Sequence, residues 1–269
     1  MRLRDLIDRF DGFVIDQYGV LHDGVRLYPG AIASLEAISE AGKRVVLVTN
    51  SGKSAAANQE RLAWLGVARA LYAAVVSSGE AARLGLEDGA FGPDFAPGGK
   101  VHVVGRTGDD YGLDRFPVQP VDLASADSLL IIGSDAPRVS LDDYAERLRP
   151  AAARRLPALC ANPDLLMLTS SGQQPAPGAI ARLYETLGGR VVYVGKPHAF
   201  IYAVASRGLA GVEPRRILAL GDSPAHDVAG AAQAGFTTAL VKTGLSAGRD
   251  DDELRRAAPS PPDFVLDGL

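Results

Sequence analysis

The sequence of 269 residues contains a single cysteine, Cys160. One thiol cannot form a disulfide within the chain, so the fold does not require an oxidising compartment. No apolar run approaches the ~20 residues that span a bilayer, which excludes a membrane-spanning helix. The first residues, MRLRDLIDRFDGF, alternate charged and apolar side chains and lack the apolar core of a signal peptide. We therefore expect a first helix there and a cytoplasmic protein without a membrane partner.

An excess of charge of one sign is also missing. Lys and Arg number 28 against 32 Asp and Glu, and no basic run stands out. Because a nucleic-acid-binding protein needs a basic surface to neutralise phosphates, we expect no nucleic-acid partner. Hydrophobic residues make up 47% and charged residues 22%, as in an ordinary globular protein of one large domain or two.

Two nucleotide-binding patterns are absent. A dinucleotide enzyme would carry G-x-G-x-x-G directly after its first strand, whereas the first apolar run is followed by DQYGVLHDG. The stretch TNSGKS contains Gly52-Lys53-Ser54 but lacks the glycine five positions before Gly52 that a P-loop requires. The sequence therefore favours neither class.

The sequence does contain a series of short apolar runs that are rich in β-branched residues. Most are continuous rather than alternating, which is typical of parallel strands covered on both faces. The runs lie at residues 13–16, 45–50, 75–78, 101–105, 129–133, 191–195, 217–222 and 237–244.

Helical patterns separate these runs, such as GAIASLEAISEAG at residues 30–42, which ends on a glycine. The alternation of strands and helices predicts an α/β fold with a doubly wound parallel sheet. A loop rich in glycine and proline at residues 85–99 precedes a second cycle of strands. This cycle either extends the same sheet or forms a second domain, and composition does not decide between them.

Polar residues stand where four of the apolar runs end. This position matters because ligands of open parallel sheets bind beyond the carboxyl ends of the strands. The residues are Asp16, Thr49-Asn50-Ser51-Gly52, Lys196, and Gly221-Asp222-Ser223 followed by Asp227.

Together these residues can hold a phosphate and a divalent metal. Carboxylate oxygens suit Mg²⁺, which also takes phosphate oxygens and water. A lysine and the donors of a turn offset phosphate charge, and an aspartate can attack phosphorus as a covalent nucleophile. Each piece alone has an ordinary structural explanation, since a strand-terminal aspartate often caps a helix. The ordered set at four strand ends is more specific.

The motifs that carry these residues resemble the haloacid dehalogenase (HAD) superfamily. They are FVIDQYGVLHDG, VVLVTNSGKS, VGKPHAFIYAVA and LALGDSPAHDVAGAAQAG, and CANPDLL resembles the cap of subfamily IIA. This NagD-like subfamily carries a C2-type α/β cap domain between its second and third motifs. The resemblance implies a Rossmann-like HAD core at residues 1–78 and 186–269, with the cap at residues 79–185.

The resemblance also implies an activity and a set of site residues. The chain would be a Mg²⁺-dependent phosphatase that hydrolyses a small phosphorylated metabolite through an aspartyl-phosphate on Asp16. Lys196 would stabilise the charge of the nucleophile and the phosphate. The implied phosphate- and substrate-binding residues are Thr49, Asn50, Ser51, Lys196 and, in the cap, Asn162 with Asp164 nearby. The implied magnesium ligands are Asp16, the backbone carbonyl of Tyr18, Asp222 and, directly or through water, Asp227.

Tyr18 departs from the family pattern. HAD phosphatases usually carry a second aspartate two residues after the nucleophile, where it protonates the leaving oxygen and then activates water. Such general acid catalysis is typically worth ~10²–10⁴-fold, whereas a tyrosine hydroxyl with a reference pKa near ~10 is a poor base at neutral pH. We therefore expect slow turnover of alkyl phosphates, a substrate with a better leaving group, or a proton from another residue. His22 is a candidate for that donor.

Two other functions remain open. HAD dehalogenases have a loop of the type D-x-Y-G-T, and halide departs without a proton, but their reaction leaves Asp222 and Asp227 without a task. The chain could instead be a phosphate- or metabolite-binding protein that has lost turnover. His226, next to Asp227, is either a metal ligand, a proton shuttle or a residue that caps or packs against the following helix. The oligomeric state is open, with a homodimer through an apolar cap face as one alternative.

Overall fold

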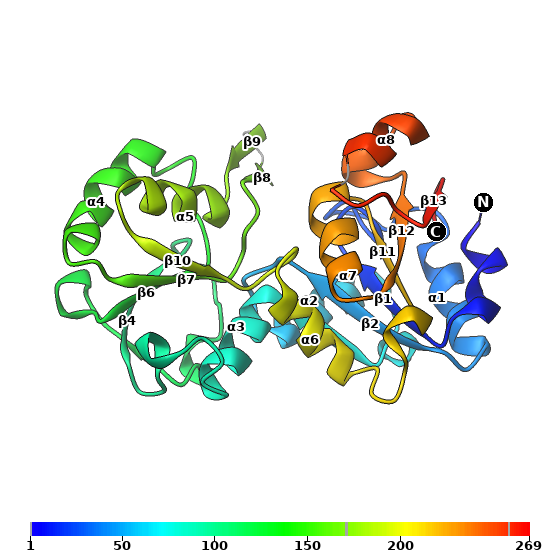
Figure 1. Ribbon diagram of the computed structural model, residues 1–269, viewed down its shortest axis with the longest axis horizontal. Coiled ribbons are helices and arrows are strands. Elements are labelled where there is room, and N and C mark those ends of the chain that lie inside the picture. Colours follow the sequence, from blue (N-terminus) through cyan, green and yellow to red (C-terminus); the bar gives the residue numbers. More distant parts are fainter. Residues whose placement is uncertain (1, 170–171, 258) are drawn as a thin grey trace. The chain divides into compact units, whose positions relative to one another are not determined.

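Residues 2–169, 172–257 and 259–269 are described by a computed structural model. They gather into two units, each with a parallel sheet of its own (Figure 1). The first unit holds residues 1–49, 55–76 and 196–269, and the second holds residues 50–54 and 77–195. The predicted α/β class with parallel sheets is confirmed.

The first unit is built on a six-stranded sheet with the strand order β13-β12-β11-β1-β2-β3. Its central strand β1 pairs in parallel with β11 on one side and β2 on the other. The carboxyl ends of these three strands therefore lie side by side in the middle of the sheet. The strands are β1 Gly12–Asp16, β2 Arg44–Thr49, β3 Ala74–Ser77, β11 Ile217–Gly221, β12 Thr237–Val241 and β13 Phe264–Leu266.

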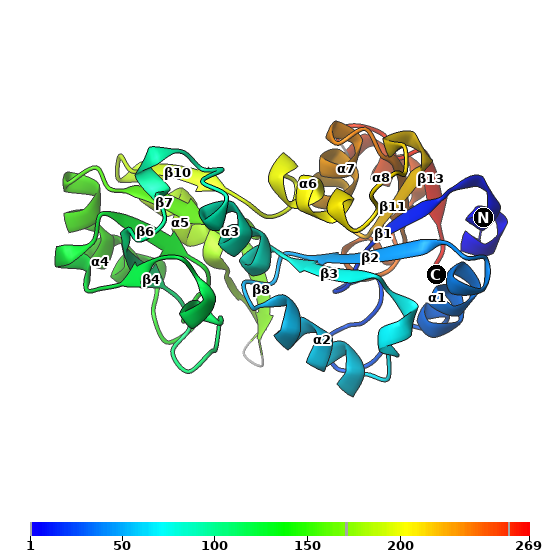
Figure 2. The same cartoon turned by 90° about the horizontal axis from the view of Figure 1, so that it is seen from below.

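Helices cover both faces of this sheet (Figure 2). Phe13 and Ile15 of β1 point to one face and share a core with helices α1 and α2. The other face packs against α6 and α7. Because both faces are covered, every residue of β1 is buried, which is why its sequence is continuously apolar. The helices are α1 Ala31–Glu40, α2 Ala55–Trp64, α6 Ala199–Arg207, α7 Ala229–Gln233 and α8 Asp251–Ala257.

The second unit has a five-stranded parallel sheet with the order β10-β7-β6-β4-β5, and β8 pairs with β9 in a separate antiparallel hairpin. Helices α4 and α5 share a core with this sheet through the buried Tyr144 and Tyr184. The strands are β4 Lys100–Val104, β5 Gln119–Pro120, β6 Ser128–Ile131, β7 Pro157–Cys160, β8 Leu166–Thr169, β9 Gly172–Pro175 and β10 Arg190–Tyr193. The helices are α3 Ser78–Glu87, α4 Leu141–Ala153 and α5 Pro177–Thr186.

The second unit differs in extent from the cap expected at residues 79–185. Strand β10 pairs with β7, so the unit continues to residue 195. Residues 50–54, which follow β2, also belong to it. That the second unit acts as a cap stays a prediction.

All the apolar runs predicted to be strands form strands, but the predicted N-terminal helix is wrong. Its place is taken by two 3-10 turns, Leu3–Asp5 and Ile7–Arg9. Phe10 has extended backbone, with φ −127° and ψ 155°, so the helical segment ends at Arg9, two residues before β1 begins. Within the described ranges no helix is both long enough and apolar enough to cross a membrane.

Candidate active site

Three of the predicted site residues end or follow neighbouring strands of the first sheet. Asp16 ends β1, Thr49 ends β2, and Asp222 comes directly after β11. The register of the sheet brings these ends together, because Ile15 pairs with Leu220 and Asp16 pairs with Val48. All three side chains are buried, as the covered strand ends require.

Lys196 joins two of the predicted carboxylates. Its ammonium Nζ lies 2.7 Å from Asp16 Oδ1 and 2.7 Å from Asp227 Oδ1, and the side chain is buried. Burial would lower the pKa of Lys196, but the charges of Asp16 and Asp227 outweigh it and raise this pKa well above its usual value. The lysine is therefore a fixed positive charge beside the predicted nucleophile.

The carboxylates outnumber this one ammonium, and their pKa values show the imbalance. Burial, with Asp227 and Asp222 adding to it, raises the pKa of Asp16 well above its usual value although Lys196 opposes the shift. Burial and the charge of Asp227 raise the pKa of Asp222 to about 7. Their ionised forms are disfavoured first by burial and then by the charges of the neighbouring carboxylates.

The residues present fit a divalent metal ion. Asp16, Asp222 and Asp227 each offer a carboxylate oxygen, and these oxygens lie within 4.8 Å of one another. An all-oxygen ligand set of this kind suits Mg²⁺, and a neighbouring cation would favour the ionised carboxylates. The cluster could therefore hold a divalent metal ion, and the assignment of these side chains as magnesium ligands stays a prediction.

Backbone groups hold the two acids that follow β11. Leu245 N donates to Asp222 Oδ2 at 2.6 Å, and Ser223 N donates to Asp227 Oδ2 at 3.0 Å. A glycine is required at position 244, where φ is +49° and a Cβ atom would lie 1.9 Å from Asp222 Oδ2. Residues 244–246 carry no signal in the sequence that places them in the site, because only the loop geometry after β12 brings them to Asp222.

The loop after Asp16 is ordered by its own backbone. Gln17 N donates to Asp16 Oδ1 at 2.7 Å, and no bond to Asp16 Oδ2 occurs among the described residues. Gly19, with φ +95°, allows the chain to turn, since a Cβ atom there would lie 2.1 Å from Asp222 Oδ2. Asp16 thus has one oxygen bound by Lys196 and Gln17 and one oxygen left for a reaction.

Tyr18 and His22 pack against each other in this loop. Their rings meet edge to face with centroids 5.9 Å apart, Tyr18 is 46% exposed, and His22 is buried. His22 Nδ1 accepts a hydrogen bond from Gly24 N, and burial lowers the pKa of His22 to about 4. Burial also raises the pKa of Tyr18. At neutral pH His22 is uncharged and Tyr18 is protonated, so neither is a ready base.

His226 lies in the short π-helix Pro224–Val228, where its backbone N donates to Ser223 Oγ at 3.2 Å. Its backbone oxygen accepts a hydrogen bond from Tyr202 Oη at 3.0 Å. These contacts show His226 as part of the π-helix that carries Asp227. A role as metal ligand or proton shuttle stays a prediction.

The remaining predicted residues belong to the second unit. Asn50 Nδ2 donates to Asp164 Oδ1 at 2.8 Å, and Asp164 N donates to Asn162 Oδ1 at 2.9 Å. The carbonyl of Ser51 accepts hydrogen bonds from Ser78 Oγ and Gly79 N. Three expected binding residues are thus held within this unit, and their part in the same site as Asp16 stays a prediction.

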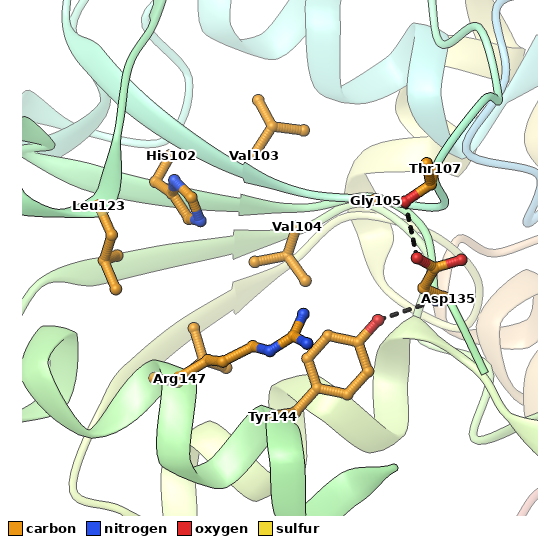
Figure 3. Close-up of a pocket in the computed structure, with 10 residues that line it drawn as sticks. His102, Val103, Val104, Gly105, Thr107, Leu123, Asp135, Tyr144 and Arg147 are labelled. Carbon is orange, nitrogen blue, oxygen red and sulfur yellow. Dashed lines mark hydrogen bonds between the residues drawn. The ribbon is translucent and has the colours of Figure 1, made fainter. Parts of the chain in front are cut away.

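A cavity of about 150 Å³ lies elsewhere in the second unit, between β4 and α4 (Figure 3). Tyr144 Oη accepts a hydrogen bond from Asp135 N there, and Thr107 Oγ1 donates to Asp135 Oδ2. None of the predicted site residues lines it. The cavity lacks the clustered carboxylates and lysine of the first sheet, so it is a poor candidate for the reaction site.

Comparison with known proteins agrees with the motifs. A family described as haloacid dehalogenase-like hydrolase matches residues 13–116, and a HAD-hydrolase-like family matches residues 193–269. Chronophin of Rattus norvegicus is 31% identical, over 91% of this chain and 80% of its own length. Glycerol-3-phosphate phosphatase of Gallus gallus is 27% identical, over 99% of this chain and 92% of its own.

Solved structures give the same result. A haloacid dehalogenase-like hydrolase from Brucella suis 1330 superposes with a TM-score of 0.84 at 32% identity, covering 100% of this chain and 98% of that one. NagD from E. coli K-12 shares the fold with a TM-score of 0.74 at 24% identity, covering 96% of each chain. The chain therefore belongs to the haloacid dehalogenase-like hydrolase family and has the NagD-like fold that its motifs predicted.

Proposed function

We propose that this hydrolase is a Mg²⁺-dependent phosphatase that acts on a small phosphorylated metabolite through an aspartyl-phosphate on Asp16. The observation that carries the proposal is the cluster in which the Lys196 ammonium bridges Asp16 and Asp227 at 2.7 Å each, with Asp222 beside them. Such a cluster offers a nucleophile, a fixed positive charge and oxygen ligands for a metal at one strand edge.

In the first step Asp16 Oδ2 attacks phosphorus, and the bond between phosphorus and the leaving oxygen breaks. Lys196 and Gln17 N hold Asp16 Oδ1, which keeps the other oxygen directed to the substrate. Magnesium, when bound by Asp16, Asp222, Asp227 and the Tyr18 carbonyl, would offset the negative charge that phosphate brings to the carboxylates. Thr49 and Asn50 would donate to the phosphate oxygens.

In the second step water attacks phosphorus and the bond between phosphorus and Asp16 Oδ2 breaks. The Asp16 carboxylate is regenerated, and the protons of the water leave with the released phosphate. Tyr18 stands where a base would be needed, and its hydroxyl stays protonated at neutral pH. We therefore expect this step to be slow, so that the aspartyl-phosphate accumulates. For the same reason the first step should favour acyl and aryl phosphates, whose leaving groups depart without a proton.

The named relatives favour hydrolysis of a phosphate ester over displacement of a halide as the reaction. The Gallus gallus relative is named a glycerol-3-phosphate phosphatase, which makes small phosphate esters the substrate class to test first. Tyr18 is the one feature that favours a dehalogenase. Against it, Asp16, Asp222 and Asp227 would repel a haloacid anion, and a carbon–halogen bond needs no metal. A cytoplasmic location agrees with this role and remains a prediction.

The test is phosphate release from p-nitrophenyl phosphate, acetyl phosphate and glycerol 3-phosphate, with Mg²⁺ or with EDTA. We expect Mg²⁺-dependent turnover of the first two, its loss in Asp16→Asn, and a 10²–10⁴-fold gain on glycerol 3-phosphate in Tyr18→Asp. Asp142→Asn, which changes an exposed acid of α4, is the control and should behave as the parent. Absence of turnover on every substrate in the parent would overturn the proposal and bring haloacid hydrolysis and ligand binding forward.

A further inference from the structure

The second unit contains a carboxylate, that of Asp164, which contacts Asn50, one of the residues predicted to bind phosphate. Asp164 Oδ1 accepts a hydrogen bond from Asn50 Nδ2 at 2.8 Å. We propose that Asp164 is a positioning residue, which fixes the side-chain amide of Asn50 so that its N–H groups and not its oxygen face a bound phosphate. The inference rests on the proposed function, because it assigns Asn50 a phosphate as its partner.

The carboxylate of Asp164 fixes which way the amide of Asn50 is oriented. An ionised carboxylate only accepts hydrogen bonds, so it pairs with the amide nitrogen of Asn50 and not with the amide oxygen. The amide nitrogen carries two hydrogens, and Asp164 accepts a hydrogen bond from one of them. An amide without this constraint can turn its oxygen toward the substrate, where it would repel a phosphate. The charge of Asp164 also strengthens the hydrogen bond beyond one between neutral groups.

Asp164 is itself held by the start of helix α5. Gly178 N donates to the Asp164 carbonyl at 2.9 Å, and Ala176 N donates to the Leu165 carbonyl at 3.0 Å. Gly178 has no room for a side chain, because a Cβ atom would lie 2.0 Å from the Pro163 carbonyl oxygen. Asp164 lies in the loop between β7 and β8, and these backbone hydrogen bonds tie that loop to the start of α5.

The backbone of residues 51–53 is held by other groups. Ser77 Oγ donates to the Lys53 carbonyl at 2.6 Å, and Gly79 N donates to the Ser51 carbonyl at 3.1 Å. Gly52 packs so closely that a Cβ atom would lie 2.2 Å from the Ile132 carbonyl oxygen. Loss of the Asp164 carboxylate should thus remove the acceptor of the Asn50 amide nitrogen and leave the backbone of residues 51–53 in place.

A double-mutant cycle tests the inference, with the inhibition constant of inorganic phosphate against p-nitrophenyl phosphate as the readout. Asp164→Ala should raise this constant by about tenfold in the parent and change it little in an Asn50→Ala background. Asp164→Asn keeps an acceptor oxygen and should have the smaller effect. The exposed Asp142→Ala is the matched control, and melting temperatures check that each variant is folded.

The outcomes separate the inference from the proposed function. Equal effects of Asp164→Ala with and without Asn50 would show that the two side chains act independently and would overturn the inference alone. An unchanged inhibition constant in Asp164→Ala would do the same. A parent that neither hydrolyses p-nitrophenyl phosphate nor binds phosphate would overturn the proposed function itself.

Discussion

His22 shows at the scale of one residue how the fold decides a role that the sequence leaves open. The sequence offered this histidine as a proton donor, but its ring is buried and burial lowers its pKa to about 4. Its Nδ1 accepts the Gly24 N–H, and its Nε2 finds no partner among the described residues. A neutral imidazole is a weak acid, so the geometry favours His22 as a packing partner of Tyr18.

The buried His22 should make stability depend on pH. An unfolded histidine binds a proton near pH 6.5, whereas His22 in the folded chain resists it down to about pH 4. The unfolded state therefore binds more protons in this window, and the free energy of unfolding falls as the pH drops from about 6.5 to 4. The contribution is on the order of 3 kcal/mol and is fully present above pH 6.5.

Urea unfolding of the parent and of His22→Gln at several pH values measures this effect. The parent should be the more stable protein at pH 7.5, and the difference should shrink as the pH falls to 4, because glutamine does not titrate. A difference that stays constant over this range would contradict the buried, neutral state of the ring.

Residues at strand ends were the easiest to predict. Asp16, Thr49 and Asp222 come directly after or at the end of continuous apolar runs, and a parallel sheet brings such ends together. The bonds of Lys196 to Asp16 and Asp227 could not be read from the sequence. These bonds depend on the π-helix Pro224–Val228, which carries Asp227 and has no hydrophobic periodicity in its sequence.

At the scale of elements, periodicity identified strands but not their neighbours. The run at 191–195 was correctly predicted as a strand, yet it was assigned to the core and lies in the second sheet beside β7. An apolar run buried on both faces has the same composition in either sheet. Strand β7, Pro157–Cys160, was not predicted, since its four residues are too short to stand out from the residues around them.

Helix α5 supplies a test of packing in the second unit. Tyr184 is fully buried, and its Oη donates to the Leu156 carbonyl at 2.8 Å. Tyr184→Phe removes this buried hydrogen bond and should lower the free energy of unfolding by about 1–2 kcal/mol. Tyr193→Phe, which removes a bond to the exposed Glu185, is the control and should cost only a few tenths. Equal losses in urea unfolding would contradict this account.

At the scale of the whole molecule, the chain forms two units with separate sheets and separate cores. Composition could not distinguish one long sheet from two, because the apolar runs look alike in both units. The family motifs predicted that a segment is inserted between two parts of the core along the chain. The substrate and the oligomeric state depend on surfaces that no motif marks, and a homodimer stays a prediction.

The covalent step on Asp16 is the central claim for the molecule as a whole. Because Tyr18 offers no ready base, the aspartyl-phosphate should form quickly and decay slowly. Mixing the parent with p-nitrophenyl phosphate and Mg²⁺ should thus give a burst of about one nitrophenol per chain. Quenching during the burst and reducing with borohydride, which converts an acyl phosphate to an alcohol, should leave homoserine at position 16.

Mass spectrometry of the peptide that contains position 16 is the measurement. We predict the homoserine product in the parent with Mg²⁺, and its absence with EDTA and in Asp16→Asn. A parent that releases nitrophenol with a burst but leaves residue 16 unmodified would contradict the nucleophilic role of Asp16.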